Sequence, residues 1–107
     1  MQLHELDTYE TPKIKLTKSL NKTTGTVTFI FSHKIIFQLI KKKKITQLTI
    51  KLNQLWIYSN NTKIKFRAGK PVQIFFIFLI KNSQEWNSFI TFLLSYAKLK
   101  KLTFKNL

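Results

Sequence analysis

Few side chains in this sequence could carry out acid–base catalysis or bind a metal. Four residues are acidic and three of them lie within the first ten positions, so Glu85 is the single carboxylate of residues 11–107. A carboxylate pair for acid–base chemistry or for magnesium is therefore missing from that stretch. The two histidines, His4 and His33, are far apart in the sequence, and no cysteine is present to complete a zinc site.

The sequence also lacks most of the residues that nucleophilic catalysis or nucleotide binding would need. A serine–histidine–aspartate arrangement would require His33 to meet Asp7, close to the N-terminus. Two glycines cannot form a glycine-rich phosphate-binding loop. We therefore expect no enzymatic activity, no bound metal and no cofactor.

Positive charge is the other chemical feature of the sequence. The chain has 19 Lys and Arg against four Asp and Glu, and Arg67 is the only arginine. Residues 1–10 carry a net charge of −3, and residues 11–107 carry +18. Such a body attracts polyanions, namely nucleic acid, an anionic lipid surface or an acidic partner. The densest basic run is either a solvated turn or a contact for an anion or anionic lipid, and it consists of Lys41, Lys42, Lys43 and Lys44.

The composition also indicates the kind of genome that encodes the chain. Lys, Ile, Phe and Asn make up 48 of the 107 residues, and all four have A/T-rich codons. We therefore interpret part of the excess of lysine as a result of drift in the base composition of the genome, and not of selection for positive charge. A compact organelle genome, such as that of a plastid, would produce this bias.

Length and hydropathy predict a single domain. A chain of 107 residues with 44% hydrophobic residues can form one folded domain, which we place at residues 12–107 after an acidic N-terminal tail at residues 1–11. The longest apolar run, Ile74–Ile80, has seven residues, whereas a spanning helix needs about 20. The first residues have neither the basic region nor the apolar stretch of a signal peptide, so we expect a soluble or peripheral protein.

From Pro12 onward the chain alternates mostly between apolar and polar residues, which is typical of β-strands. The alternation predicts strands at residues 13–17, 26–31, 46–52, 55–58, 62–66 and 72–81, with a short last strand at 102–107. Residues 72–81 are the most apolar, and apolar residues on both faces place a strand in the centre of a sheet. Residues 32–44 fit no single pattern.

After residue 81 the period becomes helical. Asn82 or Ser83 would cap the helix, and Glu85 would lie in its first turn, where the helix dipole favours an anion. The predicted apolar face consists of Trp86, Phe89, Ile90, Leu93, Leu94 and Ala97. The expected fold is an α+β domain, in which one C-terminal amphipathic helix packs on an antiparallel β-sheet.

Aromatic residues are frequent, and most of them fit a hydrophobic core. The run Phe75–Phe78 is better explained as core than as a surface that stacks nucleic-acid bases, because the following helix needs an apolar face to cover. Trp86 is expected to anchor the core. Trp56 and Tyr58 alternate on one predicted strand, and the pattern leaves their face undecided.

Several short motifs, none of them specific alone, occur in a specific order. Residues 15–19 (KLTKS) and 22–29 (KTTGTVTF) resemble the RLTRS and GTATFxF motifs that open a small photosystem II assembly-protein family, historically named the thirteen-kilodalton reaction-centre protein. Later motifs of the family are similar to residues 65–71 (KFRAGKP), 81–89 (KNSQEWNSF), 96–98 (YAK) and 102–105 (LTFK). Order, spacing and length agree over about residues 11–107.

This resemblance implies a non-catalytic accessory factor that docks on the stromal (cytoplasmic) face of immature photosystem II. The implied partners are the reaction-centre subunits and an inner chlorophyll-binding antenna subunit, whose C-terminal tail would add a strand to the sheet. No pigment or metal of its own is implied. The resemblance implies a peripheral protein on the stromal side of the plastid thylakoid membrane. The bias towards A/T-rich codons further suggests that the gene lies in the plastid genome.

The chain departs from the family pattern at three places. Lys15 and Lys18 replace arginines, Ala68 replaces a turn asparagine, and residues 41–65 carry lysine and asparagine where the family is acidic. These lysines lose the bidentate geometry of arginine.

The densest parts of the resemblance predict a protein-binding site. It comprises Lys15, Lys18, Thr24, Gly25, Thr26, Arg67 and Lys70. For Gly25 and Lys70, turn chemistry explains the residue at least as well. A basic RNA-binding or ribosomal protein is the alternative function: the charge favours it, whereas the single arginine and the lack of an RNA-recognition motif do not.

Overall fold

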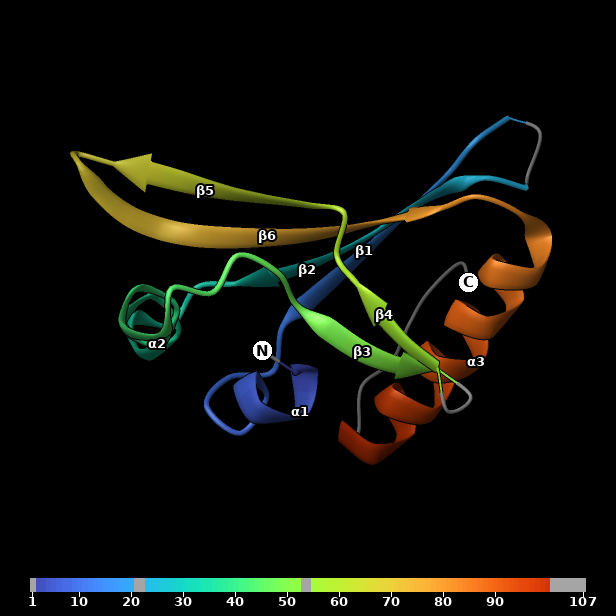
Figure 1. Ribbon diagram of the computed structural model, residues 1–107, viewed down its shortest axis with the longest axis horizontal. Helices are drawn as coiled ribbons and strands as arrows, with labels where there is room; N and C mark the ends of the chain where they lie inside the picture. The colour runs from blue at the N-terminus through green and yellow to red at the C-terminus, as the bar shows by residue number, and fades with distance from the viewer. Residues whose placement is uncertain (1, 21–22, 53–54, 101–107) are drawn as a thin grey trace.

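The computed structural model describes residues 2–20, 23–52 and 55–100 (Figure 1). In chain order its elements are α1 (Leu3–Leu6), β1 (Lys13–Lys18), β2 (Gly25–Phe31), α2 (Lys34–Lys43), β3 (Thr49–Leu52), β4 (Leu55–Tyr58), β5 (Asn61–Arg67), β6 (Lys70–Ile80) and α3 (Ser83–Lys100). The short strand expected at residues 102–107 lies outside the described residues.

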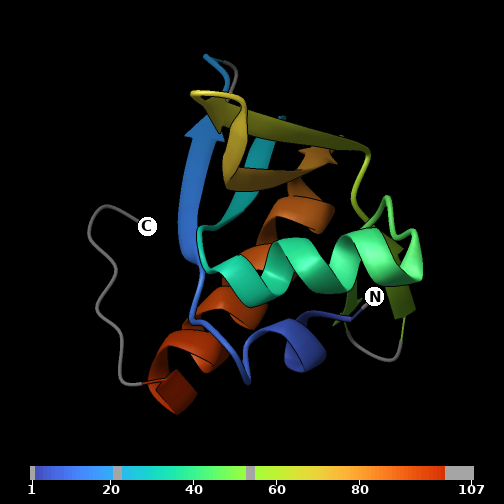
Figure 2. The same cartoon turned by 90° about the vertical axis from the view of Figure 1, so that its left-hand side faces the viewer.

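β6 lies inside a four-stranded sheet of order β1–β2–β6–β5, in which all neighbours are antiparallel. β3 and β4 form a separate antiparallel pair. The prediction that residues 72–81 occupy the centre of the sheet is confirmed. Both α2 and α3, together with the β3–β4 pair, lie on one side of the large sheet (Figures 1 and 2). The predicted α+β class with a C-terminal helix on the sheet is also confirmed.

The core is built from alternate side chains of β2 and β6, because successive residues of a strand point to opposite faces. The side chains directed towards the helices are all buried, and they are Val27, Phe29, Phe31, Ile74, Phe76, Phe78 and Ile80. Phe78 packs edge-to-face against Phe29 and Phe89, with ring centroids 5.6 and 5.5 Å apart. Such pairs add about 0.5–1.5 kcal/mol to the burial of the rings.

α3 begins with a cap of the kind that its sequence predicts. The Glu85 N–H donates to Asn82 Oδ1 at 2.9 Å, and Glu85 Oε1 accepts from the Lys81 N–H at 2.9 Å. The helix buries Trp86, Phe89, Leu93, Tyr96 and Ala97. Leu94, expected on the apolar face, is 53% exposed, and Tyr96 takes its place because the buried stripe lies slightly to one side of the predicted one.

α2 occupies the segment whose pattern was undecided. Its N-terminus is held from outside the segment, because the Glu10 carboxylate accepts the N–H groups of Ser32 and His33 at 2.7–2.9 Å. His33 Nδ1 also accepts the Ile35 N–H at 3.1 Å. Lys44, with a positive φ of 52°, ends the helix.

The N-terminal residues, expected as a tail, contribute to the core. Leu3 and Leu6 lie one helical turn apart in α1, and their side chains are 4% and 0% exposed. Asp7 forms an ion pair with Lys100 of α3 at 3.6 Å. Two apolar side chains spaced for one helix face therefore pack this segment against the domain, although its acidic residues suggested solvent exposure. The domain boundary at residue 11 stays a prediction.

Candidate protein-binding site

β4 exposes three large hydrophobic side chains in a strand of four residues. Leu55, Trp56 and Tyr58 are 66%, 40% and 56% exposed, whereas Ile57 packs against the core. The structure thus settles the face of Trp56 and Tyr58, which both lie on the side of the small sheet opposite to Ile57. Clustered apolar exposure of this kind marks interaction surfaces.

The backbone of β4 is also open on one edge. The Ser59 N–H donates to the Leu48 carbonyl at 2.9 Å, and hydrogen-bonded pairs alternate with non-bonded pairs along an antiparallel ladder. The next bonded pair towards the hairpin is Ile50 with Ile57. The N–H and C=O groups of Trp56 and Tyr58 therefore point away from β3, towards the free edge of β4.

This edge faces a groove, which we call the β4–β6 groove. It is lined by Leu55, Trp56, Ile57, Tyr58, Asn60, Leu79, Lys81, Glu85 and Phe89, and has a volume of about 300 Å³. A second cavity of about 340 Å³ at the N-terminus of α3 shares Leu55, Ile57 and Glu85 with it. In Figure 1, β4 begins beside α3 and runs towards the start of β5, so that β4 and β6 diverge towards α3.

Asn60 creates the divergence of β4 from β6. Its Oδ1 accepts the Leu79 N–H at 2.8 Å, and its own N–H donates to the Ile77 carbonyl at 2.8 Å. These two bonds end the pairing of β5 with β6 and occupy the Leu79 amide. Within the described residues, β4 is thus the wall of the groove whose backbone amide and carbonyl groups, at Trp56 and Tyr58, have no partner strand.

Charges around the β4–β6 groove are mixed. The Lys51 ammonium lies 5.7 Å from the centre of the Trp56 ring, an arrangement that attracts the cation to the aromatic face. Lys81 and Glu85 both line the groove. The groove therefore carries charges of both signs beside its apolar side chains.

The seven residues predicted as a protein-binding site fall into two separate groups. Thr24, Gly25, Thr26, Lys15 and Lys18 belong to the β1–β2 hairpin, and Gly25 pairs with Ile80 at the end of β6. Arg67 and Lys70 pair at the opposite end, in the β5–β6 turn. Ten strand residues separate Lys70 from Ile80, which is roughly 33 Å. The structure does not bring the seven residues to one place.

Within the first group, several residues have structural partners in the chain. The Lys18 ammonium lies 5.0 Å from the centre of the Trp86 ring, and Thr24 Oγ1 donates to Ser19 Oγ at 2.8 Å. A Cβ atom on Gly25 would lie 3.1 Å from the Trp86 ring and overlap the Thr17 carbonyl. These contacts explain the hairpin residues through local packing, and their role in protein binding stays a prediction.

The sequence pattern missed β4 as a site because exposure of Trp56 and Tyr58 depends on tertiary packing. One signal was available. The strand Leu55–Tyr58 has no charged residue, whereas every other strand of the structure carries at least one lysine or is an inner strand.

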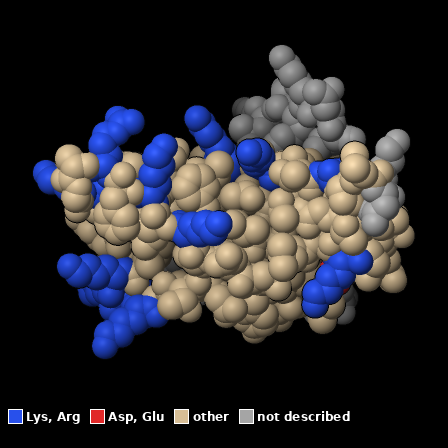
Figure 3. Space-filling model, turned by 90° about the horizontal axis from the view of Figure 1, so that it is seen from above, with Lys and Arg blue, Asp and Glu red and all other residues tan. Residues whose placement is uncertain are grey.

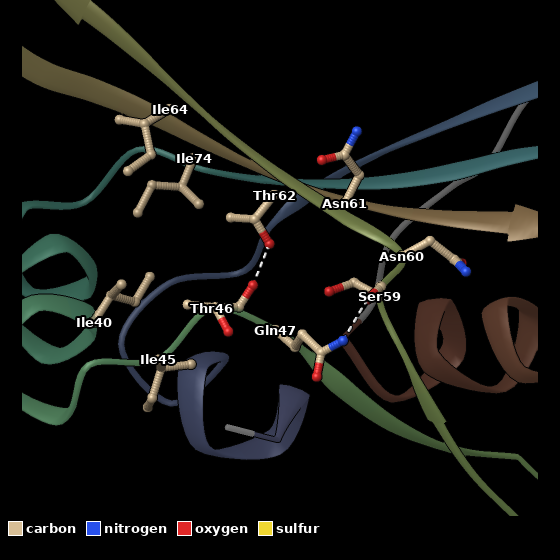
Figure 4. Close-up of a pocket in the computed structure, with 10 residues that line it drawn as sticks. All are labelled: Ile40, Ile45, Thr46, Gln47, Ser59, Asn60, Asn61, Thr62, Ile64 and Ile74. Carbon is tan, nitrogen blue, oxygen red and sulfur yellow. Dashed lines mark hydrogen bonds between the residues drawn. The ribbon is translucent and has the colours of Figure 1, made fainter.

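Another cavity, of about 480 Å³, lies between α2 and β5 (Figure 4). None of the residues that line it is ionisable at neutral pH. Its polar groups bond to one another: Thr62 Oγ1 donates to the Thr46 carbonyl, and Gln47 Nε2 donates to the Ser59 carbonyl at 3.2 Å. Its lining therefore provides no acid or base that could activate the hydroxyl groups of Thr46, Ser59 or Thr62.

Potential metal ligands do not gather in the described part of the chain either. No three His, Cys, Asp or Glu side chains within it lie close enough to hold a metal ion. Burial, and then the charge of Asp7, raise the pKa of the Tyr96 phenol well above its ordinary value. The Tyr96 hydroxyl finds no hydrogen-bond partner among the described residues. No described helix is both long enough and apolar enough to cross a membrane.

Comparison with known proteins identifies the family. Residues 3–104 match the family model described as "Psb28 protein". The chain is 33% identical over 99 residues to the Photosystem II reaction center Psb28 protein of Trichormus variabilis, covering 92% of this chain and 89% of that protein. It is 32% identical over 93 residues to the protein of the same name from Nostoc punctiforme (87% and 82% covered), and 33% identical over 93 residues to that of Gracilaria tenuistipitata var. liui (85% and 82%). A match over nearly the whole chain, in the order of motifs found in the sequence, shows that this chain belongs to the Psb28 family.

Proposed function

We propose that this protein is a non-catalytic accessory factor of photosystem II biogenesis, and that it binds the stromal face of the immature complex partly by β-strand addition. Family membership supports the association with photosystem II, since the relatives are named as reaction-centre proteins of that complex. The proposed location is therefore the thylakoid membrane, as a peripheral protein encoded in the plastid.

The observation that carries the binding mode is the free edge of β4. Strand addition needs unpaired backbone groups for affinity and side-chain contacts for specificity. At this edge the backbone groups of Trp56 and Tyr58 point outward, and their side chains are large, aromatic and exposed. Tryptophan and tyrosine are the residue types most enriched among the energetically dominant contacts of protein interfaces.

The other edges of the described sheets are less suited to a partner strand, and that of β3 already meets Gln2 through a parallel bridge at Thr49. β1 has lysine at positions 13, 15 and 18, and β5 has Lys63, Lys65 and Arg67. The pairing of β5 with β6 also shifts register between Lys65 and Phe66, as in a β-bulge. Charged side chains and bulges are the means by which proteins keep edge strands from pairing. β4, with the sequence Leu-Trp-Ile-Tyr, has neither.

The proposed occupant of the β4–β6 groove is an extended segment with apolar side chains at alternate positions. Such a segment would pair with Trp56 and Tyr58 and cover Leu55 and Leu79, which are 66% and 50% exposed. The resemblance discussed above points to the C-terminal tail of an inner chlorophyll-binding antenna subunit. Contacts with the reaction-centre subunits complete the proposal.

Titration of the protein with a synthetic peptide of that tail tests the binding mode. Trp56→Ala and Tyr58→Ala should each weaken binding by about tenfold or more, the range of dominant interface residues. Leu94→Ala is the matched control, because Leu94 is exposed to a similar degree (53%) on α3, and it should leave the affinity unchanged. Equal affinity of all variants for the peptide would exclude the β4 edge as its binding site.

Affinity purification from thylakoid membranes tests the function itself. Recovery of reaction-centre and inner antenna subunits supports the accessory role. Recovery of ribosomal RNA in their place would support the RNA-binding alternative and contradict the proposal.

A further inference from the structure

The end of the molecule formed by α2 and the β5–β6 hairpin carries nearly half of the positive charge. Nine of the 19 basic residues lie on these elements and the residue that ends α2, all of them exposed. They are Lys34, Lys41, Lys42, Lys43, Lys44, Lys63, Lys65, Arg67 and Lys70. We call this surface the basic end. Figure 2 looks directly at it, and in Figure 3 Lys and Arg gather towards the same end.

No acidic side chain within these elements offsets this charge. The sequence contains no Asp or Glu between Thr11 and Gln84. Two carboxylates flank this stretch of the chain: that of Glu10 accepts the backbone N–H groups of Ser32 and His33 at the start of α2, and that of Glu85 accepts the Lys81 N–H. With nine basic side chains and only the Glu10 carboxylate held beside them, the basic end presents a strongly positive field to a partner.

Exposed apolar side chains lie between these charges. Phe66 and Ile64, on the face of β5 that turns towards α2, are 60% and 45% exposed. Beneath them lies a groove of about 400 Å³ whose lining is almost wholly apolar, made by Phe37, Gln38, Ile40, Lys41, Ile64, Phe66, Pro71 and Ile74. The basic end thus combines an apolar tip with surrounding lysines.

We propose that the basic end docks on the surface of an anionic lipid bilayer. Lysine stems lie along apolar surface while their ammonium groups contact headgroups, and an exposed aromatic residue can enter the boundary between headgroups and acyl chains. In Figure 2, α2 runs across the view below the hairpin. A flat surface approaching along the long axis therefore meets α2 lengthwise together with the hairpin tip.

The distribution of charge favours a membrane over an acidic protein segment. Of the nine basic residues only Lys41 lines the apolar groove, and the others spread over α2 and both strands of the hairpin. Eight of the nine are lysines, which act as point charges and lack the fork geometry with which arginine grips carboxylates. The site is also separate from the β4–β6 groove and does not depend on its occupant.

Vesicle flotation with two triple variants tests the role of charge. Lys42→Gln, Lys43→Gln and Lys65→Gln together remove three charges from the basic end. Lys13→Gln, Lys15→Gln and Lys98→Gln together remove three equally exposed charges elsewhere. On vesicles of phosphatidylcholine with 30% phosphatidylglycerol, the first variant should bind roughly 100-fold more weakly than the wild type, at about fivefold per lysine near the surface. The control variant should lose less than about tenfold, and pure phosphatidylcholine should bind neither.

Phe66→Ala, compared with Leu94→Ala, tests the apolar tip. Phe66 and Leu94 are similarly exposed, at 60% and 53%, and we expect only Phe66→Ala to weaken vesicle binding, by about fivefold or more. Equal losses for the two triple variants would mean that net charge alone attracts the protein, and would overturn the proposal. It would also be overturned if poly-glutamate bound at the basic end while anionic vesicles did not, since that outcome assigns the end to an acidic protein. None of these results alters the peptide affinity expected for the β4 edge.

Discussion

The two ends of the four-stranded sheet are built differently. At one end α3 covers β2 and the C-terminal part of β6, where Phe29, Phe76 and Phe78 are fully buried. At the other end the inward-facing side chains of β5 meet α2 only in part, so that Phe66 is 60% exposed. The end under α3 is therefore closely packed, whereas the basic end leaves apolar surface exposed.

Glycine shows the same contrast. Gly25, under Trp86, lacks space for a side chain, because an added Cβ would meet the Thr17 carbonyl and the indole ring. Gly69, at the tip of the β5–β6 hairpin, has open space around it but a φ of +77°. Packing requires the first glycine, and the turn requires the second.

Removing a core ring should have the largest effect on stability. Phe78→Ala should lower the free energy of unfolding by about 3–5 kcal/mol, because it leaves a cavity against Phe29 and Phe89. Phe66→Ala, at the basic end, should cost less than about 1 kcal/mol because most of its ring is already in water. Urea denaturation of both variants measures the difference. Equal losses would contradict the division of the sheet into two unlike ends.

The next largest effects are expected from replacing the two glycines, and the two variants should differ in their fluorescence. Gly25→Ala should destabilise by about 1–3 kcal/mol through overpacking against Trp86 and Thr17. Gly69→Ala should cost about 1–2 kcal/mol through its left-handed backbone alone. Since Lys18 lies over Trp86, only Gly25→Ala should also change the tryptophan fluorescence. Unchanged fluorescence with full stability would show that the hairpin end is looser than described.

A small gain is expected at the hairpin tip. Ala68 has a φ of 52°, a region that costs a non-glycine residue about 1–2 kcal/mol. Ala68→Gly should therefore raise the free energy of unfolding by about 0.5–1 kcal/mol after the greater entropy of glycine in the unfolded chain is counted. Thermal unfolding checks the sign, and a lower melting temperature would refute this description of the turn.

Tyr96→Phe should have the smallest effect at neutral pH, within about 1 kcal/mol, because the hydroxyl lacks a hydrogen-bond partner among the described residues. At high pH the two proteins should diverge. Burial raises the pKa of Tyr96 in the folded state, so its contribution is complete below the unfolded value of about 10 and is lost as the pH rises above it. Denaturation at pH 8 and pH 11 should show that the wild type loses more stability than Tyr96→Phe. An identical loss in the two proteins would show that Tyr96 does not contribute to the fall in stability at high pH.

The sequence predicted those parts of the fold that depend on local pattern. Alternation placed the strands, and the helical period with Asn82 and Glu85 placed the start of α3. The sequence pattern could not place α2, because the Glu10 carboxylate, which fixes the N–H groups of Ser32 and His33 just before the helix, lies more than 20 residues earlier. The face of α3 was displaced towards Tyr96 for a similar reason, since the sheet and α1 decide which side is buried.

The candidate site was harder to foresee than the fold. Trp56 and Tyr58 had an undecided face, and their outward backbone depends on the pairing of Ser59 with Leu48. The predicted residues Arg67 and Lys70 proved to lie far from Gly25, because the turn and the hairpin are at opposite ends of β6. Residues chosen because they lie in well-matched motifs need not lie close together in the folded protein.

Amide hydrogen exchange, with and without the antenna-tail peptide, tests the β4 edge most directly. We predict that the Trp56 and Tyr58 amides, which have no strand partner in the free protein, become protected at least tenfold on binding. The amides of β1 and β5 should keep their rates. New protection on β1 or β5, with Trp56 and Tyr58 unchanged, would contradict the proposal that β4 receives the partner strand.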